Sequence, residues 1–149
     1  MEKNVTIMMW EQTRTNKIRE AMKIVILNED LRSEMQMYLA LSTLYDVEIA
    51  QDVEDLLYML DQNHADLTFF DLSTSDEHLK QKDRVSAVKK IRQKHPSVKF
   101  VGICDQSDRL LQKEAEKHGI DNFITRPIKN RELLELIKGK NCSPQYSLG

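Results

Sequence analysis

Carboxylate, amide and guanidinium side chains follow three separate apolar runs of the sequence, and their chemistry suits phosphate and metal ions. Asn28, Glu29 and Asp30 follow the first of these runs, Asp71 follows another, and Arg126 follows the last. Carboxylates brought together repel one another unless a divalent cation or a basic side chain lies among them. Magnesium (Mg²⁺) binds one or two carboxylates together with phosphate oxygens and water. The fold decides whether these side chains meet.

Five short apolar runs between residues 24 and 125 have the character of β-strands. Each is almost continuously apolar rather than alternating with polar residues, which is typical of strands covered on both faces, as parallel strands are. The predicted strands are 24–27, 47–50, 67–70, 98–104 and 122–125.

Helical spacing of apolar residues follows each of these runs. Asp52 and Asn130 are placed to cap two of the helices at their N-termini, and Gly119 is placed to end another in a left-handed conformation. The apolar positions that mark the five helices are Leu31, Met35 and Leu39; Val53, Leu56, Leu57 and Leu60; Val85, Val88 and Ile91; Leu111, Ala115 and His118; and Leu133, Leu136 and Ile137.

Alternating strands and helices predict an α/β fold with a parallel sheet, right-handed crossovers and helices on both faces. Ligands of such sheets bind outside the carboxyl ends of the strands. Glu29, Asp71 and Arg126 would therefore share one edge. A structural explanation competes for each residue alone, because Asp and Asn often follow strands as turn and capping residues. Three such residues at the ends of three strands favour a site.

Composition indicates one soluble domain without a nucleic-acid or membrane partner. The chain has 149 residues, a net charge of −2 and no apolar run near the ~20 residues of a membrane helix. Its balanced charge argues against a basic face for nucleic acid. Cys104 and Cys142 show no paired spacing, which fits reduced thiols in the cytoplasm. We expect an extension over 1–21, one domain over 22–140 and a flexible tail over 141–149. The four histidines lack metal-ligand spacing.

Three segments in order resemble the receiver domain of two-component response regulators, and the likeness runs from Met22 to about Lys140. KIVILNED is similar to the family's first strand and acidic pair, DLTFFDL to the strand with the phospho-accepting aspartate, and NFITRP to the strand ending in Lys-Pro. The resemblance, to an atypical member of the chemotaxis-regulator type, implies a flavodoxin-like, doubly wound sheet with strand order 2-1-3-4-5.

The resemblance also implies a phosphorelay role. A histidine kinase or phosphotransfer protein would donate a phosphoryl group to Asp71, and a downstream protein would receive the signal. Glu29 and Asp71 would hold Mg²⁺, with Asn28 as a weak ligand. Phosphoryl transfer relies mainly on positioning and charge neutralisation, which metal and cation supply. No enzymatic activity of the chain's own is expected. The helix and strand around Phe123 would form the output surface.

The chain departs from the family pattern at the site itself. Asn28 replaces a carboxylate, which weakens Mg²⁺ binding. Cys104 replaces a Thr or Ser hydroxyl that bonds the phosphoryl group, and a thiol is a poor donor. Arg126 replaces a Lys, with a planar fork in place of a compact ammonium. The loop after Asp71 lacks Met-Pro and is longer, carrying DEHLKQKDR.

Two functions therefore stay open at this point. In the first, the chain is a single-domain response regulator that accepts a phosphoryl group on Asp71 and signals through protein contacts. In the second, it is a pseudo-receiver that serves as a scaffold for other proteins without phosphate. An unrelated flavodoxin-like enzyme is disfavoured, since no Gly-rich phosphate loop follows the first strand and the chain has only 4 glycines.

Overall fold

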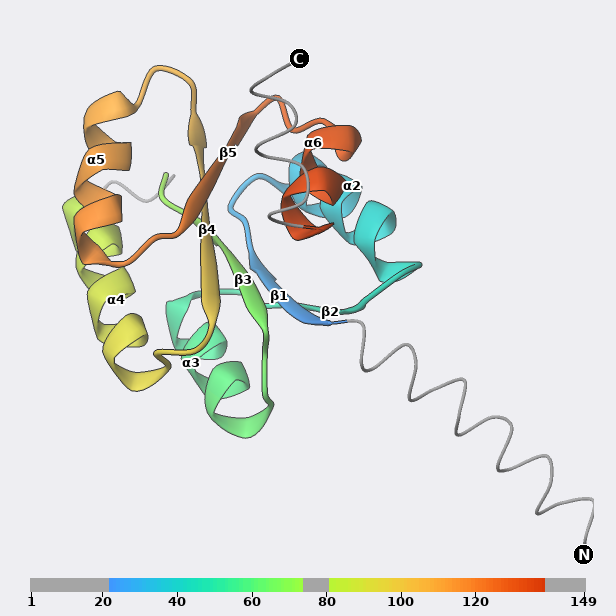
Figure 1. The fold of residues 1–149 in the computed structure, drawn as a ribbon, viewed down its shortest axis with the longest axis horizontal. Helices are drawn as coiled ribbons and strands as arrows, with labels where there is room; N and C mark the ends of the chain where they lie inside the picture. The colour runs from blue at the N-terminus through green and yellow to red at the C-terminus, as the bar shows by residue number, and fades with distance from the viewer. Residues whose placement is uncertain (1–21, 74–80, 139–149) are drawn as a thin grey trace, which may run out of the picture.

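A computed structural model describes residues 22–73 and 81–138 of the chain, which form a five-stranded parallel sheet between two layers of helices (Figure 1). The strand order is β2-β1-β3-β4-β5, as predicted, and every neighbouring pair is parallel. The strands are β1 (Lys23–Leu27), β2 (Asp46–Ile49), β3 (Leu67–Asp71), β4 (Lys99–Asp105) and β5 (Asn122–Arg126). The predicted extension over 1–21 and the tail over 141–149 lie outside the described residues.

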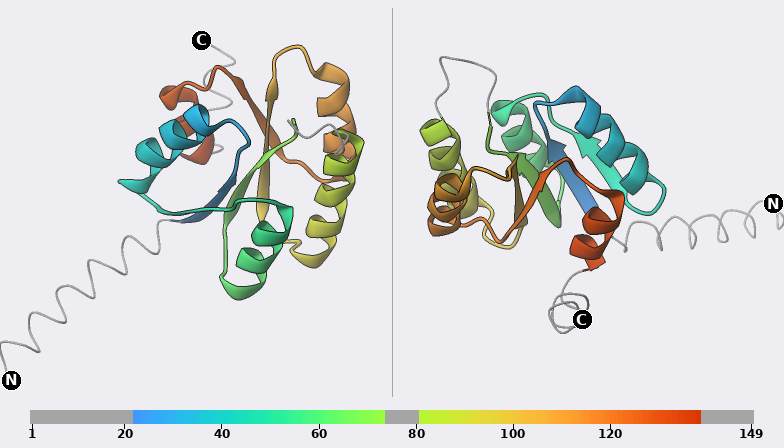
Figure 2. Two further views of the ribbon diagram at one scale, coloured as in Figure 1. Left: turned by 180° about the vertical axis from the view of Figure 1, so that it is seen from behind. Right: turned by 90° about the horizontal axis from the view of Figure 1, so that it is seen from above.

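Helices cover the sheet on both faces (Figure 2). α2 (Leu31–Ser42) and α6 (Asn130–Lys138) share one hydrophobic cluster, and α3 (Val53–Gln62), α4 (Gln81–Lys94) and α5 (Arg109–His118) share the other. The strands supply both clusters: Val25 and Leu27 face one, whereas Ile24 and Ile26 face the other. This two-sided burial explains why the strand sequences are continuously apolar rather than alternating.

The apolar face from which α2 was predicted is exposed to solvent. Leu31, Met35 and Leu39 are 69%, 49% and 64% exposed, whereas Met37 and Leu41, two positions further along and therefore on the opposite side of the helix, are fully buried. The spacing correctly predicts a helix because both sets recur every four residues. It does not identify the buried face, since this helix carries two apolar stripes.

Capping residues fix where several helices begin and end. The Asp52 carboxylate accepts a hydrogen bond from the Asp55 amide at 2.7 Å, and Gly119 ends α5 at φ 119°, both as predicted. Asn130 is not the cap of α6 but its first residue, so the helix begins one position earlier than predicted, and the Lys129 carbonyl accepts its first helical bond, from the Leu133 amide. α4 begins at Gln81, so the last residues of the segment predicted as a long loop are helical.

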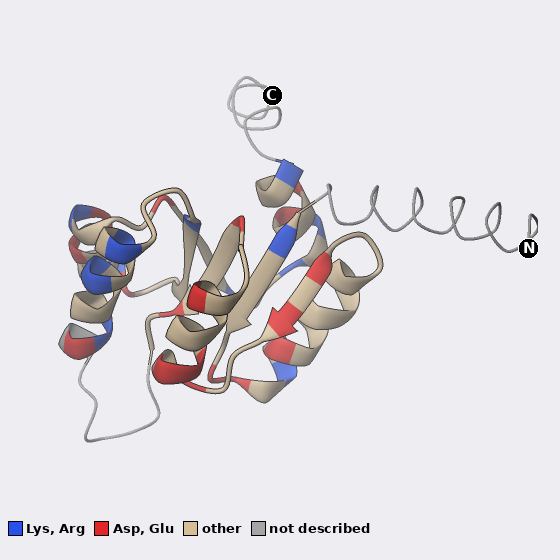
Figure 3. Cartoon of the chain, turned by 90° about the horizontal axis from the view of Figure 1, so that it is seen from below, with Lys and Arg blue, Asp and Glu red and all other residues tan. Residues whose placement is uncertain are grey.

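The described residues contain no helix long and apolar enough to cross a membrane. Charge differs from helix to helix (Figure 3): the charged side chains of α3 are all acidic, those of α4 are mostly basic with Asp83 as the one acidic residue, and α5 carries both signs. The balanced composition of the chain is thus a sum of unlike helices.

Gly102 in the middle of β4 leaves room for the ring of Phe123 on the neighbouring strand. The two residues are paired in register, and a Cβ atom at position 102 would lie 2.9 Å from Cδ1 of Phe123 and 3.1 Å from Cδ1 of Leu72. Phe123 packs against the cluster beneath α3, α4 and α5. The absence of a side chain at Gly102 therefore allows the Phe123 ring to lie close against the sheet.

We predict that Gly102→Ala lowers the free energy of unfolding by about 1–3 kcal/mol, because the added methyl group overpacks the sheet against Phe123. Urea denaturation measures the change. The same substitution in a Phe123→Leu background should cost less, since the shorter side chain relieves the collision. Equal costs in the two backgrounds would show that the Phe123 ring does not determine the penalty.

Candidate functional site

The carboxyl ends of β1, β3 and β5 bring the predicted site residues to one edge of the sheet. Asp71 is the last residue of β3 and Arg126 the last of β5, while Asn28 and Glu29 follow β1 directly. Parallel pairing explains this, because strands that run in one direction place all their carboxyl ends together. Residues that are 98 positions apart, Asn28 and Arg126, are thereby hydrogen-bonded.

Asp71 is completely buried, and its carboxylate accepts four hydrogen bonds. Oδ1 accepts from the backbone amide and hydroxyl of Ser73, at 2.9 and 2.6 Å. Oδ2 accepts from the backbone amide of Glu29 at 2.8 Å and from Nη2 of Arg126 at 2.5 Å. Four bonds match the acceptor capacity of a carboxylate, so the buried charge is fully compensated.

Arg126 connects Asp71 to its neighbours. Its Nη2 also donates to Oδ1 of Asn28 at 2.8 Å, and its Nη1 donates to Oγ of Ser73 at 3.3 Å. Nη1 lies 3.9 Å from the exposed carboxylate of Asp105. The planar fork reaches several acceptors at once, which a single ammonium in one position does less readily.

Asn28 and Asp30 have structural partners in α2. The Asn28 amide nitrogen donates to Oγ of Ser33 at 2.8 Å, which directs its nitrogen to α2 and its oxygen to Arg126. The Asp30 carboxylate accepts from the Ser33 amide at 3.1 Å and caps the helix. Hydrogen bonding by Ser33 lowers the pKa of the Asp30 carboxyl. For Asp30, the capping explanation is therefore the one that the contacts support.

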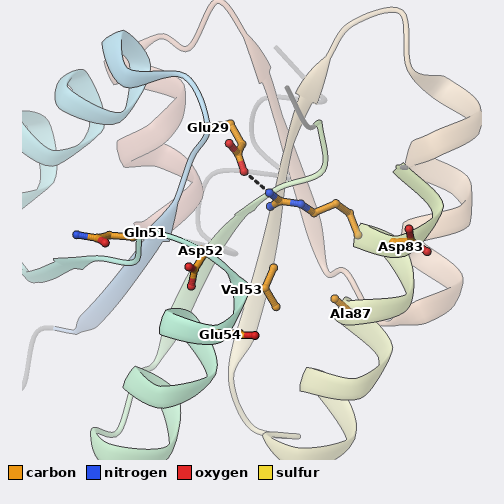
Figure 4. A pocket seen from close by; sticks show the side chains of 8 residues that line it. Glu29, Gln51, Asp52, Val53, Glu54, Asp83 and Ala87 are labelled. Atoms are coloured by element: carbon orange, nitrogen blue, oxygen red, sulfur yellow. Dashed lines mark hydrogen bonds and ion pairs between the residues drawn. The ribbon is translucent and has the colours of Figure 1, made fainter. Parts of the chain in front are cut away.

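Arg84 is a further member of the site, and it was not among the residues predicted from sequence. Its Nη2 forms an ion pair with Oε1 of Glu29, and its Nη1 donates to the backbone carbonyl of Asp71 at 3.3 Å. The guanidinium lies 5.8 Å from the ring centre of Phe70. Only 4% of Arg84 is exposed. The ion pair is visible in Figure 4.

One sequence signal could have identified Arg84. It precedes Val88 and Ile91 by four and seven residues, so it shares the buried face of α4 with them. The sequence predicts a loop at this position, because Arg84 ends the polar segment DEHLKQKDR. The structure shows it in the first turn of α4, where it reaches back to the ends of β1 and β3.

A cavity of about 630 Å³ opens beside the pair of Arg84 and Glu29 (Figure 4). It lies between the N-terminal ends of α3 and α4, and polar side chains line much of it. The lining residues are Glu29, Gln51, Asp52, Val53, Glu54, Asp83, Arg84 and Ala87. Solvent access to the site therefore exists on the Glu29 side, whereas Asp71 itself is covered.

A family model described as the response regulator receiver domain matches residues 24–138. No similar sequence was found among curated proteins. Among solved structures, NtrX from Brucella abortus superposes with a TM-score of 0.72 at 18% identity, covering 85% of this chain and 28% of NtrX. The chain thus spans little more than a quarter of that relative.

Two further structures match over nearly their whole length. The receiver domain of the TMAO respiratory system response regulator TorR has a TM-score of 0.70 at 20% identity, covering 78% of this chain and 93% of that domain. A CheY-like receiver domain protein from Methanospirillum hungatei has a TM-score of 0.69 at 22% identity, covering 86% and 98%. At these identities the structural likeness shows the receiver fold alone.

Receiver domains typically bind Mg²⁺ at their phosphorylation site, and the residues here fit such an ion poorly in this arrangement. Glu29 is paired with Arg84, both oxygens of Asp71 are engaged, and the Asn28 oxygen accepts from Arg126. Over the described ranges, no group of three or more His, Cys, Asp or Glu residues is placed to hold a metal. An octahedral ion would need several of these oxygens released.

Cys104 lies on β4 near the site but bonds elsewhere. Its sulfur is buried and accepts a hydrogen bond from Nε2 of Gln112 at 3.3 Å. Burial raises the pKa of the Cys104 thiol, and the carboxylates of Asp108 and Asp105 raise it further, against the lowering effect of Gln112. Its predicted role in bonding a phosphoryl group stays a prediction.

We predict that Cys104 reacts slowly with a thiol reagent in the folded protein, because only the thiolate attacks and the raised pKa leaves little thiolate at about pH 8. The measurement is the rate of labelling in a Cys142→Ser background. Labelling should be slower on the order of a hundredfold or more than in urea-unfolded protein. Equal rates in the two states would contradict both the burial and the raised pKa.

Proposed function

Because the chain belongs to the response regulator receiver domain family, we propose that Asp71 accepts a phosphoryl group and that the domain signals through contacts with other proteins. The observation that carries the proposal is the position of Asp71. It ends the central strand β3, with its Oδ2 bonded by the Glu29 amide and by Arg126. Receiver domains are generally signalling modules that interact with kinases or phosphotransfer proteins and with effectors.

The proposed step transfers a phosphoryl group from a phosphohistidine of a donor protein to Asp71. An Asp71 oxygen attacks phosphorus, the new P–O bond forms as the P–N bond breaks, and the imidazole leaves with the electron pair. The aspartate changes from one negative charge to an acyl phosphate with about two. Nη2 of Arg126, which lies 2.5 Å from Oδ2 of Asp71, stabilises that charge by an ion pair.

Oδ1 is the oxygen better placed to attack. Oδ2 is held by two separate residues, Glu29 and Arg126, whereas both bonds to Oδ1 come from Ser73. A displacement of Ser73 alone therefore frees Oδ1 while Oδ2 remains fixed. Since Asp71 is fully buried, such a displacement is also required for a donor to reach it.

The exposed apolar face of α2 supports a protein as the phosphoryl donor. Leu31 begins α2 just two residues after Glu29, and Leu31, Met35 and Leu39 present apolar surface beside the site. Apolar side chains grouped in this way are typical of protein-binding surfaces. We propose that the donor contacts this face. The downstream protein is proposed to contact α5 and β5, where Leu110 is 84% exposed.

Incubation with phosphoramidate, followed by intact-mass measurement, tests the proposal. The protein should gain the mass of one phosphoryl group, and Asp71→Asn should abolish the gain because the amide is not a nucleophile here. Asp61→Asn is the matched control, since Asp61 lies on α3 and pairs with Lys94 and His95. It should be labelled like the unmodified sequence.

Sensitivity of the adduct to hydroxylamine would identify it as an acyl phosphate. A protein that gains no mass, under conditions that label another receiver domain, would refute phosphoryl acceptance. The phosphate-independent scaffold would then be the function that the fold supports.

A further inference from the structure

We propose that the guanidinium of Arg84 is the resident cation of this site and takes the place of a divalent metal ion. The inference concerns the charge balance around Glu29 and Asp71. It holds whether or not Asp71 is phosphorylated, and its first test uses no phosphoryl donor.

The position of Arg84 is the first support. Glu29 is the acidic residue through which a metal would be bound, and its Oε1 is paired with Nη2 of Arg84. Nη1 of the same guanidinium donates to the main-chain carbonyl of Asp71 at 3.3 Å. One cationic group thus contacts both the β1 and the β3 ends of the site, and its ion pair with Glu29 occupies the carboxylate that a metal ion would need (Figure 4).

The fixed location of the guanidinium is the second support. Arg84 is 4% exposed, lies against the ring of Phe70, and extends from the first turn of a helix of 14 residues. A buried guanidinium is costly unless it is paired, and Glu29 supplies the pairing charge. The Arg84 side chain is therefore held in the protein interior beside the site and is not exposed at the surface.

Charge balance is the third support. The carboxylates of Glu29 and Asp71 are each paired with a guanidinium group, that of Arg84 and that of Arg126, while Asn28 contributes no charge. A divalent ion added between these two pairs would lie against two guanidinium groups, and like charges at such distances repel. The neutral side chain of Asn28 and the positive charge of Arg84 both lower the affinity of the site for a divalent ion.

Two buried N–H donors without a partner are consistent with a site that binds an anion. Nε of Arg84 and Nε of Arg126 are buried and have no hydrogen-bond partner among the described residues. Guanidinium groups bind phosphate oxygens through several N–H groups at once. The two arginines can thus compensate the charge of a phosphoryl group on Asp71 without a metal ion.

Titration with Mn²⁺, followed by the electron paramagnetic resonance signal of free Mn²⁺, tests the inference directly. Millimolar Mg²⁺ serves as competitor. The unmodified protein should leave the Mn²⁺ signal unchanged at millimolar metal. Arg84→Met, which keeps the length and apolar contact of the stem but removes the charge, should bind Mn²⁺ at least about tenfold more tightly.

Two further variants locate the effect. Arg84→Lys retains a positive charge and should exclude Mn²⁺ nearly as the unmodified protein does. Glu29→Gln introduced into Arg84→Met should remove the gained binding, because it removes the ligand that the substitution released. Circular dichroism establishes that each variant is folded; if Arg84→Met is not, Arg84→Gln replaces it.

Mn²⁺ binding by the unmodified protein at the affinity of Arg84→Met would overturn the inference, and so would a folded Arg84→Met or Arg84→Gln that gains no binding. Phosphoramidate labelling that persists in the presence of EDTA is the second expected result, and it alone rests on the proposed function. If labelling fails while metal exclusion is observed, only the phosphoryl-acceptor proposal is refuted. If labelling requires Mg²⁺, the resident-cation inference is refuted and the proposed function stands.

Discussion

The buried carboxylate of Asp71 is the constraint on which the site depends. A charge removed from water must be compensated by hydrogen bonds and opposite charge, and they come from the loop that follows Asp71 and from two segments distant in sequence. Ser73 bonds one oxygen, while the Glu29 amide and Arg126 bond the other. The positions of the β1–α2 turn, the start of the β3–α4 loop and the end of β5 are thereby linked to a single functional group.

The departures from the usual receiver pattern form one coherent set in the structure. Asn28 supplies a neutral oxygen to Arg126 and an amide to α2, where a second carboxylate would need another cation. Arg126 uses its planar fork to contact Asn28, Asp71 and Ser73 together. Arg84 then neutralises Glu29. Two guanidinium groups thus balance two carboxylates, which is a different solution from an acidic pocket filled by a metal ion.

Family membership and fold rest on different observations from the function proposed for this chain. The family model spans most of the chain, whereas NtrX, TorR and the Methanospirillum domain share only 18–22% of residues with it and show the fold alone. The same scaffold can keep its sheet while its site chemistry changes. Phosphoryl acceptance is therefore proposed from the contacts of Asp71 and Arg126 themselves, and metal exclusion from the contacts of Arg84.

The parallel sheet could be predicted from the amino-acid pattern, because five continuous apolar runs alternate with helical spacing, and that topology placed Glu29, Asp71 and Arg126 at one edge. Packing in three dimensions selected which apolar stripe of α2 is buried, since two stripes of equal spacing compete. It also decided the role of Arg84. A charged residue in a polar segment indicates solvent, and only the packing of α4 against β3 shows that its guanidinium turns inward to Glu29.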